Sequence, residues 1–551
     1  MFDLIIRGGR VVDGAGNPWF PADVAISGDR ISEVGRLDGA EAEREIDASG
    51  KIVCPGFVDI HSHSDFIMAV DEHMQILAPF PEQGITTIVT GNCGYSPAPV
   101  NPATSAELAS YTQFLCGPPL PDAWRSFGEY LDYLEANGVG LNVVPMVAHG
   151  ALRIHEVGFA GRGLTDHEHR AMRRQLEQAL DEGAFGLSTG LLYAPGIFAP
   201  PEEIEALAAS LARYDAIYTS HIRGSSETLL PATKEVIKVG EVNGVRCQHS
   251  HVEAFGRQHW RKIDTVLSLH EDARRRGVDT GFDVIPYTAA NTTLLAIFPP
   301  WALSGGVDAL LGRLRDPEQR ERIRRSIEED QPGWPCWVEG TWPHNLVLAT
   351  GWDNVQVMWV ASTENSHLQG KSIAEIAASR DADPFDVAAD LVLDEGGHAM
   401  ALYIGVSGEP GDDAGLETLL RHPAAAVETD AILTGQGVPH PAAHGAFPRV
   451  LGEFARDRRS FPMEEAIRKM TSLPAQRFGL RHRGLLRPGM FADIVVFDPD
   501  TVADHTTYDH PDAAPEGIER VLINGREVVR EGKLDRHALA GRVVRRGSSE
   551  E

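Results

Sequence analysis

The sequence predicts an α/β protein: a TIM-like (β/α)8 barrel with a small β domain built from both chain termini and an inserted small domain at the barrel mouth. Three observations support this fold class. Apolar strand-like runs alternate with helical stretches through the centre of the chain, which is typical of a buried parallel sheet. Alternating strand patterns with tight turns stand at both ends of the chain. One stretch rich in Pro and Trp interrupts the central alternation.

Both ends of the chain carry short strands separated by Gly, Asp and Asn turns. Residues 1–55 contain DLIIRGGRVVDG, PADVAISGDRISEVG and EREIDASGKIVCPG, and residues 485–551 contain MFADIVVFDPD and IERVLINGREVVREGKL. Alternating apolar residues in such runs favour antiparallel strands. We expect the two sets to pair into one β-sandwich domain, and two unrelated hairpins are the alternative.

Residues 56–484 are expected to form the barrel, in which eight strand-like runs alternate with helices. The runs are GFVDIHSH, GITTIVTGN, LNVVPMVAHG, AFGLSTG, AIYTSHIR, VRCQHSHVEA, DTGFDVIPY and AAAVETDAIL. A ninth run, NVQVMWVAS, lies near residues 354–362, so one of the nine must be peripheral. Residues 291–350 are expected to form an insertion over the barrel mouth. One helix is marked by a capping box of Thr165 and Glu168.

Composition and charge restrict the classes of function. The 551 residues carry a formal net charge of −29, which argues against nucleic acid and anionic membranes as partners because both need clustered Lys and Arg. Met1–Arg7 is charged at once and no apolar run is long enough to cross a bilayer, so we expect neither a signal peptide nor a membrane span. The five scattered cysteines form no CxxC pair, which favours a reducing cytoplasm. A homo-oligomer is compatible with this composition.

Polar side chains stand where the strand-like runs end, the position at which barrel enzymes place their active sites. In DIHSHSD a strand period of two puts His61, His63 and Asp65 on one face, so two imidazoles can share a metal ion. Two unconnected surface histidines are the alternative. Cys93 follows the next run in GNCG, where flanking glycines let a thiolate approach a cation that would lower its pKa. The alternative for this cysteine is a buried apolar filler.

Three further strand ends add donor groups. His221 ends one run in SHIR and His251 ends the next in SHVE, although His249 lies on the same face as His251 and leaves that choice open. Asp430 ends the last run in ETD, where a turn or helix-capping aspartate is the alternative. Together these runs bring two metal-binding His pairs, Cys93 and Asp430 to one rim, from strands 1, 2, 5, 6 and 8. The set predicts a zinc-dependent hydrolase, and no GxSxG nucleophile motif competes with it.

These residues and their surroundings resemble the amidohydrolase superfamily, and within it the D-aminoacylases, or N-acyl-D-amino-acid deacylases. The resemblance covers nearly the whole chain and is carried by DLIIRGGRVVDGAGNPWFPADVAISGDRI, PGFVDIHSHSD, GNCG, SHIR, GAFPRVLGEFAR and RPGMFADIVVFDP. It implies that Cys93 takes the place of the carbamylated lysine that bridges two metals in relatives such as the hydantoinases. Cys93, His221 and His251 would then hold one zinc tightly, and His61 with His63 would form a second, weaker or unfilled site.

The resemblance implies hydrolysis of the amide bond of a small N-acyl compound, with Asp430 as the base that becomes the acid. Two other functions stay open at this point. One is a hydrolase for cyclic amides, carbamates or lactams on the same scaffold, because loops change the substrates that a barrel accepts. The other is a non-catalytic scaffold or binding protein, against which the complete ligand set argues.

Substrate recognition departs from the family pattern. D-aminoacylases usually read PHPR followed by an aromatic residue two positions on, and that Arg grips the substrate's α-carboxylate; here Ala442 and His444 occupy the two positions. Losing a guanidinium removes a charge-assisted contact that a buried carboxylate needs. We therefore expect a substrate that lacks a free α-carboxylate or carries its charge elsewhere. The residues expected to contact it are Tyr193, Arg223, Tyr287, Asn291 and Thr292.

Overall fold

The computed structural model describes residues 1–335 and 341–548, and in that part of the chain parallel strands form a barrel. One sheet contains β6, β7 and β8, and a second contains β9 to β13 and β17; β8 and β9 are two halves of one strand, so the barrel has the eight strands expected. The strands are β6 (Phe57–Asp59), β7 (Ile85–Thr90), β8 (Asn142–Pro145), β9 (Val147–Ala148), β10 (Gly186–Gly190), β11 (Ile217–His221), β12 (Cys247–His249), β13 (Thr280–Val284) and β17 (Ala425–Val427).

The last strand closes onto the first at the carboxyl end of the barrel. Asp430 N–H donates to the carbonyl of His61 (3.0 Å), and His63 N–H donates to the carbonyl of Ala431 (3.1 Å). Ser62 and Ala431 also form a parallel bridge. This pairing lies beyond the ends of β6 and β17, so it places the two predicted histidines directly beside the predicted aspartate.

Helices cover the outer face of the barrel. They include α5 (Phe127–Asn137), α6 (His149–Val157), α7 (Asp166–Asp181), α8 (Pro201–Ala208), α9 (Leu229–Asn243), α10 (Ile263–Arg275), α17 (Ala414–Arg421), α19 (Met463–Met470) and α20 (Ser472–Phe478). Helix α7 buries Met172, Leu176 and Leu180, which recur every four residues and so form one apolar stripe. The capping box predicted for this helix is confirmed, because Thr165 accepts from Glu168 N–H and Glu168 accepts from Thr165 N–H.

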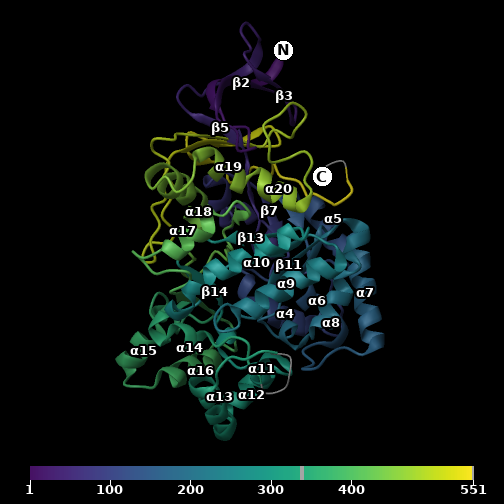
Figure 1. Cartoon of the computed structure of the whole chain (residues 1–551), viewed down its shortest axis with the longest axis vertical. Coiled ribbons are helices and arrows are strands. Elements are labelled where there is room, and N and C mark those ends of the chain that lie inside the picture. Colours follow the sequence, from purple (N-terminus) through teal and green to yellow (C-terminus); the bar gives the residue numbers. More distant parts are fainter. Residues whose placement is uncertain (336–340, 549–551) are drawn as a thin grey trace.

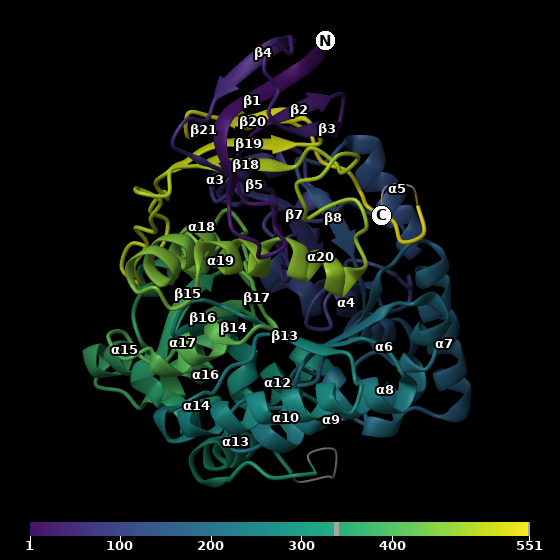
Figure 2. The same cartoon turned by 45° about the horizontal axis from the view of Figure 1, so that its top comes forward.

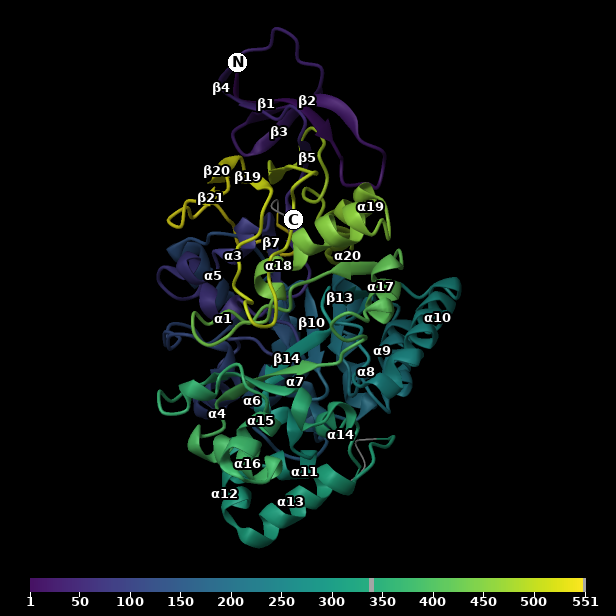
Figure 3. The same ribbon diagram turned by 90° about the vertical axis from the view of Figure 1, so that its left-hand side faces the viewer.

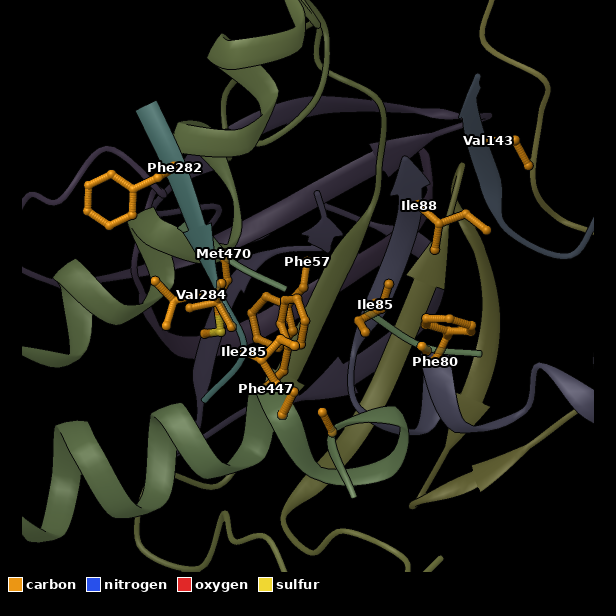
Figure 4. Close-up of a cluster of buried hydrophobic side chains, with 14 of the residues drawn as sticks. Phe57, Phe80, Ile85, Ile88, Val143, Phe282, Val284, Ile285, Phe447 and Met470 are labelled. Atoms are coloured by element: carbon orange, nitrogen blue, oxygen red, sulfur yellow. The ribbon is translucent and has the colours of Figure 1, made fainter. Parts of the chain in front are cut away.

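The core between barrel and helices fixes the first strand. Phe57 of β6 stacks on Phe447 of α18 (Ala442–Arg449), with ring centroids 5.6 Å apart. Figure 4 shows these two rings facing each other, with Ile285 and Met470 close by. Truncating a buried Phe costs about 3–5 kcal/mol, so this contact holds β6 firmly. Residues 61–63 follow one residue after β6, so this contact also fixes their position.

The two ends of the chain build one sheet of nine strands. Its order is β21-β20-β19-β18-β5-β1-β2-β3, with β4 paired to β1. The bounds are β1 (Phe2–Val11), β2 (Phe20–Ser27), β3 (Arg30–Gly35), β4 (Ala42–Asp47), β5 (Ile52–Pro55), β18 (Ile494–Phe497), β19 (Ile518–Ile523), β20 (Arg526–Arg530) and β21 (Lys533–Leu534). Figure 2 shows the purple N-terminal and yellow C-terminal strands in one layer over the barrel. The expected pairing of both termini is thereby confirmed, and the alternative of unrelated hairpins is wrong.

A long segment leaves the barrel after β13 and returns at α17. It forms helices α11 (Pro300–Leu303), α12 (Gly306–Arg315), α13 (Pro317–Glu329), α14 (Leu346–Thr350), α15 (Ile373–Arg380) and α16 (Pro384–Asp394), and strands β14 (Ala289–Thr293), β15 (Val355–Val360) and β16 (Ala399–Ile404). Figures 1 and 3 place these helices at the end of the molecule opposite the terminal sheet.

The expected insertion, 291–350, is therefore shorter than the segment that the structure places outside the barrel. The run NVQVMWVAS is β15, which pairs with β16 and not with a barrel strand, so it is the peripheral ninth run. Its apolar, β-branched sequence reads like a barrel strand because it too is buried. Residues 336–340 of the insertion, including Cys336, lie outside the described residues.

Two expectations about the whole chain can be compared with the described residues. None of their helices has both the length and the apolar character needed to cross a membrane. Four cysteines fall in the described ranges, Cys54, Cys93, Cys116 and Cys247, and all four are free thiols and buried.

Candidate metal centre

Five predicted metal ligands and the predicted aspartate meet at the carboxyl end of the barrel. One is the last residue of β11, the others come from the turns that follow β6, β7, β12 and β17, and each is at least nine-tenths buried. Their ligand atoms form two clusters that share Cys93, and within each cluster the atoms lie within 4.8 Å of one another. The residues are His61, His63, Cys93, His221, His251 and Asp430.

The first cluster contains Cys93, His221 and His251. Cys93 Sγ lies 3.4 Å from His251 Nε2. Cys93 and His251 both have positive φ, at 50° and 35°, which non-glycine residues adopt rarely and mostly at functional sites. The structure also decides between His249 and His251, a choice that the sequence left open, because the turn at His251 brings its ring to the cluster. His249 ends β12 and lies with its Nδ1 3.3 Å from His270 Nε2 on the covering helix α10, away from the cluster.

The second cluster contains His61, His63, Cys93 and Asp430. His61 Nε2 lies 3.2 Å from Cys93 Sγ and 3.3 Å from Asp430 Oδ1, and His63 Nε2 lies 3.3 Å from the same Oδ1. Asp430 also has a positive φ, at 47°. The aspartate thus faces both imidazoles and stands beside the thiol that the two clusters share.

Glycines let the Cys93 turn pack against the end of β10. A Cβ on Gly190 would lie 2.0 Å from the carbonyl oxygen of Cys93, and one on Gly94 would lie 2.7 Å from Gly190 N. Real Cβ atoms do not approach other atoms so closely, so both positions need glycine. Ser188 of β10 ties the same turn by accepting from Gly94 N–H (3.2 Å) and donating to the carbonyl of Gly91.

Carboxylates behind the histidines orient the rings. Glu428 Oε2 lies 3.0 Å from His61 Nδ1 and Asp283 Oδ1 lies 3.6 Å from it, while Glu253 Oε1 lies 3.3 Å from His251 Nδ1. A carboxylate at one ring nitrogen fixes the proton there and turns the other nitrogen toward a metal. These three acids were not predicted as site residues from the sequence, although Asp283 and Glu428 stand at strand ends as the ligands do.

The charges in the two clusters favour a bound cation. Burial raises the pKa of Cys93, but the surrounding imidazoles outweigh burial and hold it well below its ordinary value, so the sulfur is a thiolate. Burial likewise raises the pKa of Asp430, but His61 and His63 bring it below its ordinary value. Burial lowers the pKa of His63, whereas Asp430 and Cys93 raise it to about 9. Two buried anions among imidazoles are the electrostatic setting of a metal site.

Comparisons with known proteins agree with this geometry. The family model described as Amidohydrolase family matches residues 44–221 and 349–529. N-acyl-D-glutamate deacylase of Alcaligenes xylosoxydans xylosoxydans is 35% identical over 549 residues, which cover 99% of this chain and 97% of that protein. The chain belongs to the amidohydrolase family. The predicted family is thereby confirmed, and with it the prediction of a hydrolase.

Two solved structures place this amidohydrolase more closely, in the branch of the D-aminoacylases. One is N-acyl-D-glutamate deacylase from Bordetella bronchiseptica in complex with zinc and a phosphonate inhibitor, with a TM-score of 0.80, 33% identity and 99% of each chain covered. The other is a D-aminoacylase studied for the role of its binuclear metal centre, with a TM-score of 0.80, 32% identity, and coverage of 99% of this chain and 100% of that one. The match over both full chains confirms the barrel fold.

The donor set of this amidohydrolase fits zinc. A thiolate and two imidazoles are ligands that zinc prefers, and three protein ligands leave the fourth position of a tetrahedron open, as in catalytic zinc sites. Cys93, His221 and His251 supply such a set. His61, His63 and the shared Cys93 supply donors for a second ion. A calcium or magnesium site would instead present mainly oxygen ligands.

The structure brings three of the five expected substrate-contacting residues to the metal clusters. Tyr193 Oη accepts from Thr292 Oγ1 (2.9 Å) and lies 3.5 Å from His221 Nδ1. Asn291, beside Thr292 on β14, lines the same cavity, and neither its amide nitrogen nor its amide oxygen has a hydrogen-bond partner among the described residues. These three residues therefore have polar atoms at the site.

Arg223 and Tyr287 do not lie in this cavity, so the expectation for them needs correction. Both Oε atoms of Glu235 accept from Arg223 Nε (3.0 and 2.8 Å), and its other nitrogens donate to backbone carbonyls, so the guanidinium is held inside the fold. Tyr287 Oη donates to Asp504 Oδ2 (2.8 Å) and lines a small cavity behind His251. Asp504 lies 217 residues from Tyr287, and the groups that hold Arg223 lie 12 to 26 residues from it, so no local pattern predicted either placement.

The clusters open into a cavity of about 520 Å³, its mouth included, which we call the metal cavity. Besides the metal ligands, His344, Tyr403 and Asn291 line it. Ser225 N–H donates to His344 Nδ1 (3.3 Å), so the ring proton lies on Nε2, which has no partner among the described residues. Burial lowers the pKa of His344 to about 3, so this donor is neutral. Tyr403 Oη likewise has no partner there.

No Lys or Arg occurs among the described residues that line the metal cavity. Ala442, at the position where the resemblance places an arginine, is fully buried in the core and is not part of that lining. The lining contains the acids Glu253 and Asp430 together with His63, whose pKa of about 9 makes it a cation before any metal binds. The metal cavity therefore combines a cation-binding end with a wall of neutral hydrogen-bonding groups.

Proposed function

We propose that this amidohydrolase cleaves the amide bond of a small neutral N-acyl compound with the help of zinc. One observation carries the proposal: Cys93, His221 and His251 gather one thiolate and two imidazoles beside the carboxylate of Asp430. Three donors for a metal and one free carboxylate at the mouth of a barrel are what metal-assisted hydrolysis requires.

Cys93, His221 and His251 would hold one zinc ion tightly, and His61 with His63 would bind a second ion more weakly. This division is supported by the solved D-aminoacylase, which is described by one-metal activation and second-metal attenuation. When bound, zinc acts as a Lewis acid that makes water more acidic and polarises an amide carbonyl.

Asp430 is proposed to transfer a proton from the attacking water to the departing amine. Its pKa is held below the ordinary value despite burial, so the carboxylate is ionised at neutral pH and can accept a proton from the attacking water. The same Oδ1 then donates that proton to the departing amine nitrogen. His63, 3.3 Å away, keeps the carboxylate oriented during both transfers. Tyr193 accepts from Thr292, so its own hydroxyl proton remains available to an oxygen of the substrate.

The amine half of the substrate is proposed to lack a free α-carboxylate. A buried carboxylate is held best by a paired guanidinium or ammonium, and no Lys or Arg occurs among the described lining residues of the metal cavity. His344, Asn291 and Tyr403 present neutral donors and acceptors without partners, which suit a carboxamide or an ester.

A substrate panel tests both halves of the proposal. Zinc-loaded protein would be assayed with N-acetyl-D-amino acids, their methyl esters and their primary amides, together with the L enantiomers. We expect cleavage of the acetyl amide bond in the esters and primary amides, and poor turnover of the free acids. A marked preference for the free acids would overturn the neutral-substrate proposal while leaving amide hydrolysis intact. Absence of cleavage throughout the panel would count against amide hydrolysis itself.

We also propose a cytoplasmic location, because the tight site depends on a reduced cysteine. Cys93 must be a free thiolate to bind metal, and an oxidising compartment would compete for it. The four cysteines in the described ranges are free thiols. Localisation of a tagged chain by fractionation would test this, and recovery in an oxidising compartment would contradict it.

A further inference from the structure

A second, apolar cavity adjoins the metal cavity. We call it the acyl chamber; it measures about 680 Å³ with its mouth and the open space above it included. The two cavities share four lining residues, Tyr95, Phe114, Leu192 and Tyr193. These four residues form the boundary between the two cavities, so a group bound at the metal ligands lies next to the chamber.

Aromatic rings lead from the metal ligands into the chamber. The ring of Tyr95 lies 6.0 Å from that of His63, measured between centroids, and stacks on Tyr111 at 4.4 Å. Phe114 meets Tyr95 edge to face at 5.2 Å, and Tyr111 meets Phe159 in the same manner at 5.9 Å. All of these rings are at least nine-tenths buried. The rings hold one another in place, so this side of the chamber is already shaped in the free protein.

The opposite wall comes from the segment that leaves the barrel after β13. Leu303 of α11, Val307 of α12 and Trp342 face the chamber from this side. The chamber thus lies between the barrel mouth and the inserted helices, which Figures 1 and 3 place together at one end of the molecule. Side chains of the insertion therefore determine how long a bound group can be.

The chamber offers no charge to a ligand. No Asp, Glu, Lys or Arg occurs among the described residues that line it. The hydroxyl of Tyr111 donates to the carbonyl of Gly94 (3.3 Å), and that of Tyr193 accepts from Thr292. Burial lowers the pKa of His398, the histidine of the lining, so this ring is neutral as well. A charged group placed here would leave water without gaining a counter-charge, whereas a hydrocarbon gains by leaving water.

We infer that the acyl chamber binds the acyl group of the substrate, and that this group is an aliphatic or arylalkyl chain much longer than acetyl. The inference rests on the proposed amide hydrolysis and adds the substrate class. In the neutral substrate proposed above, the amine half carries a carboxamide or an ester, and the acyl half can be a hydrocarbon. The unpartnered polar atoms of Asn291, His344 and Tyr403 line the metal cavity outside the shared wall, so they match the polar half. The apolar chamber matches the hydrocarbon acyl half.

A series of N-acyl glycinamides tests the inference, because glycinamide is achiral, small and neutral. Acetyl, butyryl, hexanoyl, octanoyl and phenylacetyl compounds would be compared on zinc-loaded protein. We expect kcat/KM to rise about fourfold for each methylene that enters the chamber, until the chamber is full. A flat series, or one that falls from acetyl onward, would overturn the inference.

Variants of Val307 test whether the dependence of kcat/KM on chain length arises in the acyl chamber. Val307→Phe places a larger side chain in the chamber, so the ratio of octanoyl to acetyl kcat/KM should fall about tenfold or more, equivalent to losing roughly two buried methylenes. Val307→Ala enlarges the chamber and should shift the preferred chain toward longer acyl groups. Val242→Phe, on the exposed face of α9, serves as the control and should change neither rate. If Val307→Phe lowers kcat/KM equally for the octanoyl and acetyl compounds, Val307 has only a structural role and the inference is overturned.

Binding without turnover separates this inference from the proposed function. Octanamide should raise the melting temperature of wild-type protein more than acetamide does, and Val307→Phe should remove that difference. If short amides are cleaved but neither rate nor melting temperature depends on chain length, the chamber inference is wrong and amide hydrolysis stands. If octanamide binds in the chamber but no amide is cleaved, the proposed function is wrong and the apolar site stands.

Discussion

Cys93 Sγ lies 3.4 Å from His251 Nε2, although 158 residues separate the two along the chain. The same sulfur lies 3.2 Å from His61 Nε2, so one thiolate serves both donor clusters. The barrel makes this possible by bringing the ends of β6, β7 and β12 to one rim. Both proposed metal sites therefore depend on a single side chain.

Removing that side chain should remove the metal. Cys93→Ala is expected to lose bound zinc and at least about 100-fold of the turnover, because a zinc site without its thiolate keeps only neutral imidazoles. Zinc per chain would be measured by plasma mass spectrometry after dialysis. Cys116→Ala is the matched control, since that buried thiol donates only to the carbonyl of Thr112 and should be dispensable for metal binding. Full zinc and normal turnover in Cys93→Ala would show that the assignment is mistaken.

Removing the proposed proton carrier should leave the metal in place. Asp430→Asn keeps the size of the side chain but cannot accept the proton, so turnover is expected to fall about 10²–10⁴-fold. Its zinc content and melting temperature should match the wild type, because the tight cluster of Cys93, His221 and His251 does not include Asp430. Unchanged turnover, or a loss explained entirely by unfolding, would contradict the role of Asp430 in proton transfer.

A change that touches no ligand should also weaken metal binding. Gly190→Ala would place a Cβ 2.0 Å from the carbonyl oxygen of Cys93, so the Cys93 turn must move and its sulfur moves with it. We expect zinc affinity to fall about 10–100-fold, as it does when groups that support ligands are altered. Competition with a chromogenic chelator would measure this affinity.

Gly312→Ala is the control for that substitution. No atom lies within 4 Å of the Cβ it would add, and its position inside helix α12 means that alanine should stabilise the helix by roughly 0.5–1 kcal/mol. Its zinc affinity should equal that of the wild type. If Gly190→Ala behaves in the same way, the Cys93 turn does not depend on its close approach to β10.

The barrel could be predicted from the sequence, and so could the residues that gather at its rim, because their signals are local. Apolar runs that end in HSH, GNCG, SHIR and ETD reveal strand ends within a few residues. Glu428 and Asp283 were not predicted because they meet His61 only after β17 closes onto β6, with β13 beside β17. Arg223 and Tyr287 were predicted to contact the substrate because no local sequence pattern identifies Glu235 or Asp504 as their partners.

The acyl chamber could not be predicted for a related reason. Its walls come from the turn after β7, the loop after β10 and the inserted helices, and no periodic pattern connects these segments. The end of the insertion was also misplaced, because β15 is as apolar as a barrel strand. Only the pairing of β15 with β16 shows that it lies outside the barrel. Long-range pairing is the information that residue patterns alone do not contain.

A buried ion pair beside the barrel should make stability depend on pH. Glu203 of α8 accepts from Arg153 Nη1 with both carboxylate oxygens at 2.7 Å and lies 3.0 Å from His149 Nε2. Burial raises the pKa of Glu203, but His149 and Arg153 outweigh it and lower the pKa to about 2 from an ordinary value of 4.5. The folded-state pKa is thus depressed, so the stabilisation is present above about pH 4.5 and is lost as the pH falls toward 2.

Glu203→Gln should therefore destabilise the protein most at neutral pH. Arg153 is fully buried and would keep an uncompensated charge, which costs about 3–5 kcal/mol in the free energy of unfolding. Urea unfolding at pH 7 and pH 3 should show the gap between variant and wild type narrowing at the lower pH, where Glu203 itself begins to take up a proton. Glu205→Gln is the control on the same helix, because its partner Lys238 is 58% exposed and such pairs contribute less than about 1 kcal/mol. An equal gap at both pH values, or a loss no larger than that of the control, would show that the buried pair does not stabilise the fold through its charge.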